Sequence, residues 1–599
     1  MNKQKKRNEI DNKYKWAIED LFQNDDDWMK ELEETKGLIK DISKYQGRLG
    51  ESSHTLLEFL KLKDKLSLHF ERVYVYAHQK YHEDTSVSTY QDFQSRASSL
   101  GVLLESALSF ATPEILGIEE GKLNQFLNEN EGLKLYEFEL NEILRKKPHT
   151  LSAEMEEIVA SAGEMAEAPS NIFSMFNNAD IKFPQIEDEN GDLVDVTHSR
   201  FGMFLDSSNQ RVRRDAFKSI YSVYKKFRNT LAATYVANLK QEAFMAKVRK
   251  YPNAMARALD QSNVPLEVYT NLIEAVHDNL PLMHRYVSLR KKLLNLPELH
   301  MYDLYTPIVG DVDMKINYEE AKEMVYNGLQ PLGEDYLKRL KEGFDNKWID
   351  VYENEGKRSG AYSWGAYGTH PYVLLNYQDN LDNVFTLAHE MGHALHSYHS
   401  DMNQPINYAG YTIFVAEVAS TCNEALLMDY LLKKTTDKKE RAYLINHFLE
   451  QFRTTLYRQT MFAEFEMITH GKVMDGESLT ADILCQIYRD LVTKYFGDDI
   501  IIDEEIDMEW ARIPHFYNSF YVYQYATGYS AAIALSRRIL NEGKVAVDDY
   551  INKFLSGGSS DYSIELLKKA GVDMSTRTPV NEALQLFASL LDEMEELMA

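Results

Sequence analysis

The sequence predicts a mainly α-helical protein with one small β-sheet element, and three observations favour this fold class. Glycine and proline, which disfavour helix interiors, number only 28 and 14 among 599 residues. Residues 56–100 carry apolar side chains at helical spacing and contain neither glycine nor proline. Hydrophobic residues make up 44% of the chain and aromatic residues 12%, which is enough for a large core and excludes global disorder.

Successive amphipathic helices are expected from residue 10 to about residue 180. Residues 181–196 differ, because two short alternating runs flank Asn190 and Gly191, a pair typical of a two-residue hairpin turn. One interpretation places a domain boundary here, with an N-terminal helical domain over residues 1–199 and a second domain over residues 200–599. A surface hairpin inside a single domain is the alternative.

A second break in the helical pattern covers residues 359–377. Three glycines, Gly360, Gly365 and Gly368, are followed there by a short apolar run. This pattern predicts a glycine-rich edge strand with a loop. From residue 381 to the end, the pattern is again mostly helical.

Residues 389–393 read His-Glu-Met-Gly-His, the strongest chemical signal in the chain. Two histidines four positions apart lie one turn apart on the same helical face and can bind one metal ion. Glu390 lies about 100° round the helix, where it can act as general base toward a water molecule on that ion. Since the ion lowers the pKa of this water towards ~7, the pattern predicts metal-assisted hydrolysis at neutral pH.

The residues around this motif favour a buried helix. Asn380 and Asp382 are suited to cap its start. Gly392 costs about 1 kcal/mol of helix propensity relative to alanine, and a small residue there would let a second helix pack close to the metal ligands. An apolar stripe at helical spacing follows the cap: Val384, Ala388, Met391 and Leu395.

A catalytic zinc site usually has three protein ligands, so a third is needed. His399 has the metzincin spacing from His389, but that pattern requires a glycine three residues earlier, where this chain has histidine. Glu417 and Glu424 lie seven positions apart in an apolar helical segment. A helix packed on the first would bring Glu417 to the metal, with Glu424 holding the free ring N–H of a ligand histidine. We favour Glu417, and His399 stays the alternative.

The blocks HEMGHALHSY and AEVASTCNEALL resemble those of the oligoendopeptidase F family, a bacterial branch of the thimet-oligopeptidase-like zinc peptidases. The stretches KYKWAIEDLFQNDDDW and HFYNSFYVYQYATGYSAA fit the same family. The resemblance implies a multi-helix fold with a deep channel for short peptides, and a catalytic zinc-peptidase domain within residues 200–599. It also implies one Zn²⁺ per chain, held by His389, His393 and Glu417, with Glu390 as the base.

The segment 515–529 combines one histidine with several tyrosines. Tyr517, Tyr521 and Tyr525 are four positions apart and are expected on one helical face. Peptide hydrolysis needs a hydrogen-bond donor to the tetrahedral oxyanion. By resemblance to the wider family, His515, Tyr521 and Tyr525 are candidates for this role, and Tyr529 is a candidate for substrate binding. An aromatic stripe in a helical core is the alternative.

The glycine-rich segment is a candidate for holding the peptide substrate. An exposed strand edge can bind a peptide as an extra strand through main-chain hydrogen bonds. Gly360, Ala361, Tyr362 and Gly365 are the residues expected to form this edge. An ordinary structural turn and strand is the alternative.

Charge and cysteine content exclude other classes of function. Lysine and arginine number 66 against 93 aspartates and glutamates, a net charge of −27, which disfavours binding to nucleic acid or an anionic membrane. Two cysteines cannot form a disulfide framework, and no long apolar run predicts a membrane span. We therefore expect a cytoplasmic enzyme acting on short peptides. A catalytically silent, helical peptide-binding protein is the contrasting hypothesis, and the sequence predicts no oligomeric state.

Overall fold

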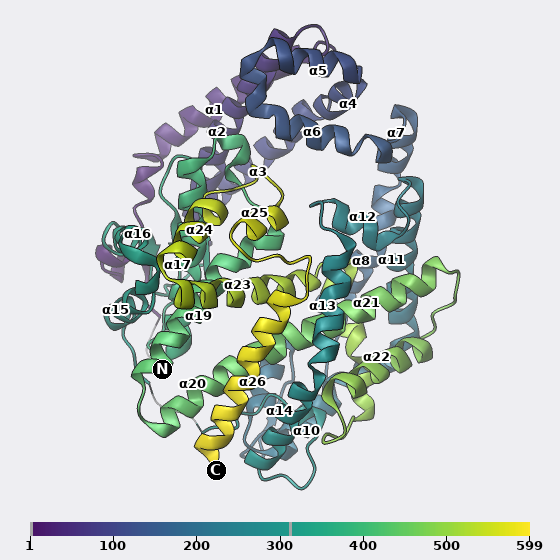
Figure 1. The fold of residues 1–599 in the computed structure, drawn as a ribbon, viewed down its shortest axis with the longest axis vertical. Helices are drawn as coiled ribbons and strands as arrows, with labels where there is room; N and C mark the ends of the chain where they lie inside the picture. Colours follow the sequence, from purple (N-terminus) through teal and green to yellow (C-terminus); the bar gives the residue numbers. More distant parts are fainter. Residues whose placement is uncertain (1–3, 311–313) are drawn as a thin grey trace. The chain divides into compact units, whose positions relative to one another are not determined.

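The computed structural model describes residues 4–310 and 314–599, and helices make up most of them (Figure 1). The predicted mainly α fold class is confirmed. The chain divides into two compact units, each assembled from three separate stretches. Unit 1 comprises Met1–Pro148, Met314–Tyr430 and Leu535–Gly571, and unit 2 comprises His149–Asp313, Leu431–Ala534 and Val572–Ala599. These units follow packing contacts rather than chain order, and the division predicted at residues 199 and 200 stays a prediction.

Unit 1 contains the helices of the N-terminal stretch and those that carry the metal-binding motif. Its helices are α1 (Asp25–Ile42), α2 (Ser53–Glu83), α3 (Ser88–Leu108), α4 (Ala111–Gly117), α5 (Glu120–Glu129), α6 (Glu137–Arg145), α15 (Tyr318–Gly328), α16 (Gly333–Asp345), α17 (Leu381–Asn403), α18 (Ile406–Ala409), α19 (Ile413–Lys434, as far as Tyr430), α24 (Lys544–Asp549) and α25 (Ser563–Lys569).

A three-stranded sheet of unit 1 has the strand order β3 (Ile349–Asp350), β5 (Tyr372–Leu374), β4 (Tyr362–Trp364). Strand β5 pairs in parallel with β3 and antiparallel with β4. The apolar run after the glycines is therefore the central strand, and the predicted edge strand is β4.

The hydrophobic core of unit 1 joins this sheet to α1, α2 and α3. The Trp28 indole of α1 donates a hydrogen bond to the Val73 carbonyl of α2 (2.9 Å) and stacks on Phe93 of α3 with ring centres 3.9 Å apart. Tyr372 and Leu374 of β5 are fully buried in the same core. The long N-terminal helices thus support the sheet in which β4, whose residues are partly buried, is an edge strand.

Unit 2 contains thirteen α-helices among its described residues. They are α7 (Ala153–Ser161), α8 (Gly163–Met175), α9 (His198–Asp206), α10 (Gln210–Lys226), α11 (Arg228–Val248), α12 (Ala254–Asp260), α13 (Leu266–Asp278), α14 (Leu280–Leu293), α20 (Lys438–Gln451), α21 (Arg458–Met474), α22 (Ala481–Phe496), α23 (Tyr523–Glu542, as far as Ala534) and α26 (Thr578–Met598).

The predicted hairpin is present in unit 2, but its loop is longer than expected. Strands β1 (Ile186–Glu187) and β2 (Leu193–Val194) pair antiparallel. The Asp188 N–H donates to the Asp192 carbonyl (2.9 Å), so three residues form the loop instead of two. Gly191 takes the left-handed conformation (φ 86°) that closes a three-residue loop of this kind. The prediction of a two-residue turn was therefore wrong by one residue.

The two helices that carry the predicted metal ligands pack closely in unit 1. The Asn380 side chain caps α17 by accepting the Asn383 N–H (2.9 Å), as predicted. The predicted apolar stripe of α17 is fully buried, and α19 is buried along its Val415, Val418 and Cys422 face. A Cβ atom on Gly392 would lie 2.6 Å from the Cα atom of Ser420. Glycine at this position is what lets the backbones of α17 and α19 approach.

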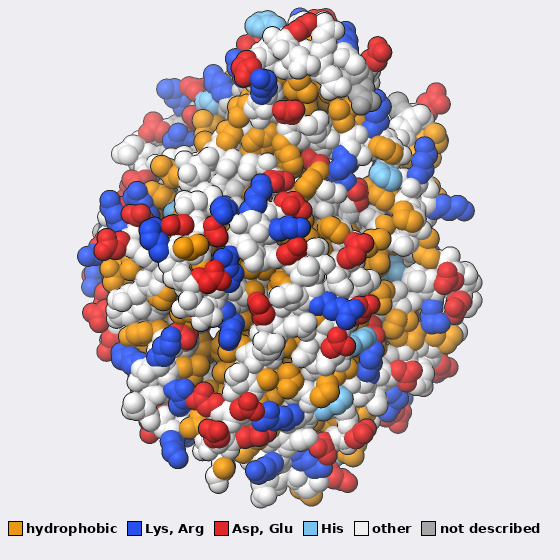
Figure 2. All heavy atoms as spheres, viewed as in Figure 1, with side chains coloured by type: hydrophobic (Ala, Val, Ile, Leu, Met, Phe, Trp, Pro, Cys, Tyr) orange, Lys and Arg blue, Asp and Glu red, His pale blue; other side chains and the backbone are white. Residues whose placement is uncertain are grey.

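The surface shows no segregation of charge on the face drawn in Figure 2, where acidic and basic side chains are interspersed. Both cysteines are free thiols. One helical stretch, Ser88–Gly117, is long and apolar enough to cross a bilayer by length and composition, with a mean hydropathy of 1.2. A single stretch at this level is weak support for a membrane span.

We predict that Gly392→Ala destabilises the protein by about 1–3 kcal/mol or more, because the new methyl group meets the backbone of α19, which cannot rotate away as a side chain would. Urea unfolding of full-length variants measures this change. Gly37→Ala on α1 is the matched control: its Cβ would meet nothing within 4 Å, so we expect a gain of about 0.5–1 kcal/mol. Equal stability of the wild type and Gly392→Ala would contradict the close approach.

Candidate metal centre

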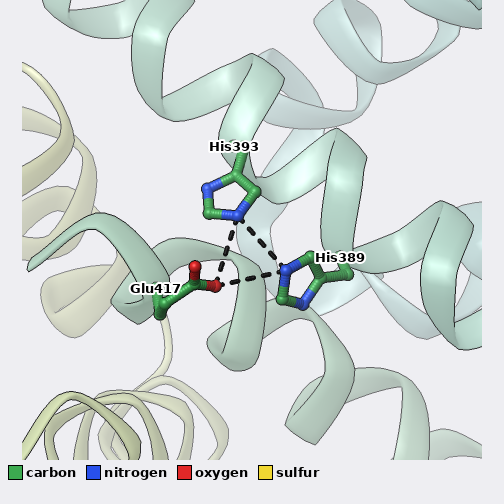
Figure 3. A group of neighbouring side chains, drawn as sticks. All are labelled: His389, His393 and Glu417. Carbon is green, nitrogen blue, oxygen red and sulfur yellow. Dashed lines mark hydrogen bonds and ion pairs between the residues drawn. The ribbon is translucent and has the colours of Figure 1, made fainter. Parts of the chain in front are cut away.

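Three side chains of α17 and α19 point their donor atoms at one another (Figure 3). The Nε2 atoms of His389 and His393 are 3.2 Å apart. The Oε2 atom of Glu417 lies 3.2 Å from Nε2 of His389 and 3.3 Å from Nε2 of His393. The structure therefore brings together the two histidines of the motif and the glutamate predicted from the second helix.

This triangle of donor atoms fits a tetrahedral metal ion. Bonds of about 2.0–2.1 Å at tetrahedral angles separate neighbouring ligand atoms by roughly 3.3–3.4 Å. The three separations of 3.2–3.3 Å agree with that spacing. Two imidazoles and one carboxylate are also a donor set that suits zinc and leaves a fourth position open.

Side chains around the triangle hold two of its members in place. Oε1 of Glu424 lies 2.6 Å from Nδ1 of His389, on the side of the ring opposite Nε2. The Ser420 hydroxyl donates to Oε2 of Glu417 (3.1 Å). Hydrogen bonds of this kind fix the tautomer and orientation of a ligand histidine. Glu424 occupies the position predicted for it.

The carboxylates also set the charge of the triangle. Burial alone would lower the pKa of His389, but hydrogen bonds to Glu417 and Glu424 outweigh burial and raise this pKa to about 10. Burial would raise the pKa of Glu417, but hydrogen bonds from both histidines hold it well below its usual range. A cation bound at Nε2 of His389 therefore displaces a proton, while Nδ1–H stays on Glu424.

Glu390 lies beside the triangle as a buried carboxylate, 6% exposed. Burial raises its pKa, the nearby histidines oppose this rise, and Glu417 and Glu424 add to it. Its Oε2 atom has no hydrogen-bond partner within residues 4–310 and 314–599. A carboxylate with a raised pKa and an unused acceptor atom is suited to take up a proton as a general base.

The alternative third ligand, His399, lies elsewhere on α17. Its ring stacks on Tyr336 with centres 6.2 Å apart, and burial lowers its pKa to about 4. It is absent from the group of converging donors found in the described part of the chain. The reason is angular: ten residues along an unbroken helix turn His399 to a different face from His389, and the glycine that would end the helix is missing.

One further group of possible metal donors occurs among the described residues, on α1 and α2. It consists of Glu31, Glu34 and His69. His69 already forms an ion pair with Glu31 (2.6 Å), and Glu34 is half exposed and lies 4.0 Å from Lys30. We assign this group to surface pairing of the two helices.

The predicted histidine and tyrosine cluster is present in unit 2. The Tyr525 hydroxyl lies 3.4 Å from Nε2 of His515. The Tyr521 ring is 5.5 Å from that of Tyr525, edge to face, and stacks on His515 at 6.0 Å. His515 is exposed, and partial burial of its ring lowers its pKa, so the ring is neutral at pH 7. The three side chains can present hydrogen-bond donors together.

The predicted helical face of three tyrosines is wrong. A short 3₁₀ helix ends at Tyr517, and α23 begins only at Tyr523. Tyr517 instead stacks on Phe173 with ring centres 4.5 Å apart. The loop between the helices turns at Phe520, whose φ of 59° is a strained conformation for a bulky residue.

Helix α21 holds this strained turn in place. The Phe520 N–H donates to Oε1 of Glu466 (2.8 Å), and the His470 ring packs 4.4 Å from the Phe520 ring. Glu466 is fully buried, and burial raises its pKa to about 8. The turn, rather than helical periodicity, brings Tyr521 beside His515. Tyr529 is 5% exposed and packs against Phe452, and its role in substrate binding stays a prediction.

The edge strand β4 offers one residue with outward main-chain groups. The N–H groups of Val373 and Leu375 point to β3, so those of Tyr372 and Leu374 point to β4. Main-chain N–H and C=O groups alternate in direction along a strand, so those of Tyr362 and Trp364 point to β5. The main-chain groups of Ser363 point away from β5, to the outer edge of the sheet. The Tyr362 hydroxyl bonds to Nδ1 of His82 (2.8 Å), so this side chain is anchored inside unit 1.

Comparison with known proteins decides the family. The model of "Peptidase family M3" matches residues 203–586, which is more than half of the chain, and the "Oligopeptidase F" model matches residues 114–183. The chain belongs to peptidase family M3. Within it, the close relatives are oligoendopeptidases F, so the predicted resemblance is confirmed.

Relatives match this M3 peptidase over its full length. It is 52% identical to Oligopeptidase PepF of Bacillus subtilis (strain 168), over 99% of this chain and 88% of the relative. The crystal structure of oligoendopeptidase-F from Enterococcus faecium is 39% identical and superposes with a TM-score of 0.74, over 96% of this chain and 99% of that one. A Chlamydophila abortus structure assigned as a peptidase is 35% identical, with a TM-score of 0.93, over 99% and 100% of the two chains.

Three residues that support the centre of this M3 peptidase were not predicted from the sequence. Asn423 on α19 donates to the Ala388 carbonyl of α17 (3.1 Å), and Ser420 orients Glu417. Ser363 supplies the outward groups of β4. A polar residue inside the apolar pattern of α19 was a signal for Asn423, whereas the role of Ser363 depends on strand register.

We predict that the metal-free protein loses the stabilisation by His389 as the pH rises. The folded pKa of about 10 lies above the ordinary value of 6.5. The folded state therefore binds more protons between these values, and the stabilisation, complete below pH 6.5, disappears as the pH passes 10. Urea unfolding in chelator, comparing wild type with His389→Gln, measures it: the difference in unfolding free energy should shrink from pH 6.5 to 10. A constant difference would contradict the charged imidazole.

Proposed function

We propose that this M3 peptidase is a zinc-dependent endopeptidase that hydrolyses short peptides, with Glu390 as general base. The observation that carries the proposal is the triangle of donor atoms, 3.2–3.3 Å apart, with the unpartnered Oε2 of Glu390 beside it. The names of the relatives, oligopeptidase and oligoendopeptidase, support short peptides as substrates.

His389, His393 and Glu417 would hold the ion. When bound, zinc would polarise the scissile carbonyl and lower the pKa of a water molecule. Glu390 then takes the proton of the attacking water and passes it to the leaving amine. Its pKa, which burial raises, suits both steps, because a carboxylate with a raised pKa holds a proton more readily than a solvent-exposed one and can release it again. Glu424 keeps the His389 ring oriented throughout.

His515, Tyr521 and Tyr525 are proposed to stabilise the oxyanion of the tetrahedral state. Their mutual contacts in unit 2 support a shared role, because each ring limits the rotation of its neighbours. A preorganised hydrogen-bond donor is worth about 10²–10³ in kcat at such sites. The predicted deep channel for peptides stays a prediction.

The main chain of β4 is proposed to bind the substrate backbone as an added strand. The outward N–H and C=O groups of Ser363 support this role, since they can pair with any peptide sequence. Of the residues predicted for this edge, Tyr362 faces inward. Gly360, Ala361 and Gly365 flank the strand and stay candidates.

We predict that Glu390→Gln retains one zinc per chain and lowers kcat by about 10²–10⁴, because the variant keeps the ligands and loses only the base. Metal content by mass spectrometry and cleavage of a fluorogenic peptide measure the two effects. Chelator should abolish wild-type cleavage, and zinc should restore it. Cleavage by the variant at the wild-type rate would contradict the assigned base, and zinc with peptide binding but no cleavage by the wild type would favour the silent binder.

The assignment of Glu417 as third ligand has a control in His399, which lies on α17 with the two ligand histidines. Glu417→Gln should lose zinc, whereas His399→Gln should keep it, because only Glu417 faces the histidine pair. The reverse result would restore the metzincin-type arrangement.

We also predict that Tyr525→Phe lowers kcat by about 10–10³ and leaves KM within a few-fold, because a donor used in the transition state does not hold the ground state. Tyr517→Phe, which removes a hydroxyl from a partly buried ring stacked on Phe173, is the control and should leave both constants unchanged. Steady-state kinetics on one peptide decide this. Equal kcat values for the two variants would remove Tyr525 from the mechanism.

A further inference from the structure

A cavity of about 540 Å³ lies in unit 1 between α2, the end of α17 and the edge strand β4. Ser363 and Gly365 form its β4 side, and Ser397 and Asp401 form its α17 side. Ser363, whose main-chain groups point away from β5, is thus one of the residues that line this cavity. A peptide paired with β4 would place side chains within its reach.

Two carboxylates line the cavity without a cation to balance them. Glu71 of α2 accepts the Tyr367 N–H (3.0 Å). Asp401 forms no hydrogen bond or ion pair with any residue in the described part of the chain. Burial raises the pKa of both groups, that of Asp401 to about 7, and the charge of Glu71 adds to the rise at Asp401. Half-buried carboxylates without a cation beside them are costly, and a bound cation would lower that cost.

The aromatic walls of the cavity also suit a cationic group that is carried on a chain of methylene groups. Phe70, Tyr74 and Trp364 line the cavity and pack against one another, with ring centres 5.3 Å and 5.9 Å apart. Aromatic faces attract ammonium and guanidinium groups and cover the methylene groups that carry them. An aromatic wall and two acids therefore favour the same kind of ligand.

Helix α17 fixes the spacing between this cavity and the donor triangle. His393, Ser397 and Asp401 follow one another at four-residue intervals on the same side of the helix. Eight residues at 1.5 Å each separate the backbones of His393 and Asp401 by ~12 Å. An extended peptide covers that distance in about three to four residues at ~3.3 Å each.

We propose that this cavity is a subsite for a positively charged group of the peptide, bound by Asp401 and Glu71 about three to four residues from the scissile bond. The proposal rests on the proposed peptidase function. An amino group at the peptide N-terminus and a lysine or arginine side chain share the required chemistry. Two of the acidic residues behind the net charge of −27 would thereby contribute to the choice of substrate.

The test uses peptides with one fixed cleavage site and lysine, norleucine or glutamate placed in turn at each position on both sides of it. For full-length wild type, we expect kcat/KM for lysine to exceed that for norleucine at least 10-fold at one position three or four residues from the cut. In the double variant Asp401→Asn with Glu71→Gln, this ratio should fall below 3-fold. Glu58→Gln, an exposed acid of α2 outside the cavity, should retain the wild-type ratio.

Acetylated and free N-termini distinguish the two sources of charge. A lysine gain that survives acetylation identifies a side chain as the ligand, whereas a gain lost on acetylation identifies the terminal amine. Thermal unfolding checks that the double variant folds. Since it replaces unbalanced half-buried acids with neutral amides, we expect its midpoint to equal or exceed that of the wild type.

Peptide binding to Glu390→Gln, measured by fluorescence anisotropy, separates this proposal from the proposed function. If the wild type cut no peptide, the peptidase proposal would fail, while the lysine-to-norleucine ratio of Kd would still test the subsite. The proposed subsite would be overturned if the lysine-to-norleucine ratio, measured by binding or by cleavage, were the same with and without the Asp401→Asn and Glu71→Gln substitutions. The lack of any lysine preference at all positions would overturn it as well.

Discussion

The close approach of α17 and α19 at Gly392 is the constraint on which the rest of the centre depends. A side chain there would meet the backbone of Ser420, and no rotamer change could relieve that contact. The absence of a side chain lets Glu417 of α19 reach the two histidines of α17. It also lets Asn423 bond to the Ala388 carbonyl, which fixes one helix along the other. A residue that weakens its own helix is thus required by the packing of two helices.

Charge explains how three ligands and a base can share one small volume. The His389 ring lies between two carboxylates, with Glu424 at Nδ1 and Glu417 at Nε2, and their hydrogen bonds raise its pKa. In the proposed mechanism, a divalent ion would replace one proton at Nε2 of His389 and would supply the charge that polarises the scissile carbonyl. Glu390 is left buried and unpaired nearby, which is unfavourable for folding and suited to proton transfer. Asp401, near the C-terminal end of α17, and Glu71 of α2 are likewise partly buried carboxylates without a neighbouring cation. The peptide substrate is proposed to supply that cation.

Helical periodicity and capping preferences predicted much of the candidate metal centre from the sequence. The features that were not predicted depend on packing between segments far apart in the chain. Two histidines at helical spacing, the Asn380 cap and the buried stripe of α17 follow from the periodicity of one helix. Glu417 followed from an acidic residue inside an apolar segment, although its distance from the histidines depends on Gly392. The expected face of tyrosines failed because Phe520 turns the chain and Glu466 on another helix holds that turn. Ser363 and the two-unit division depend on pairing between segments far apart in the chain, which periodicity does not reveal.

The most direct test is a crystal structure of Glu390→Gln with zinc and an uncut peptide, with anomalous diffraction measured at the zinc edge. We expect one strong anomalous peak per chain within bonding distance of His389, His393 and Glu417, and a peptide backbone paired with Ser363 of β4. A peak at another set of residues, or no peak in protein that cleaves peptides, would refute the proposed zinc site.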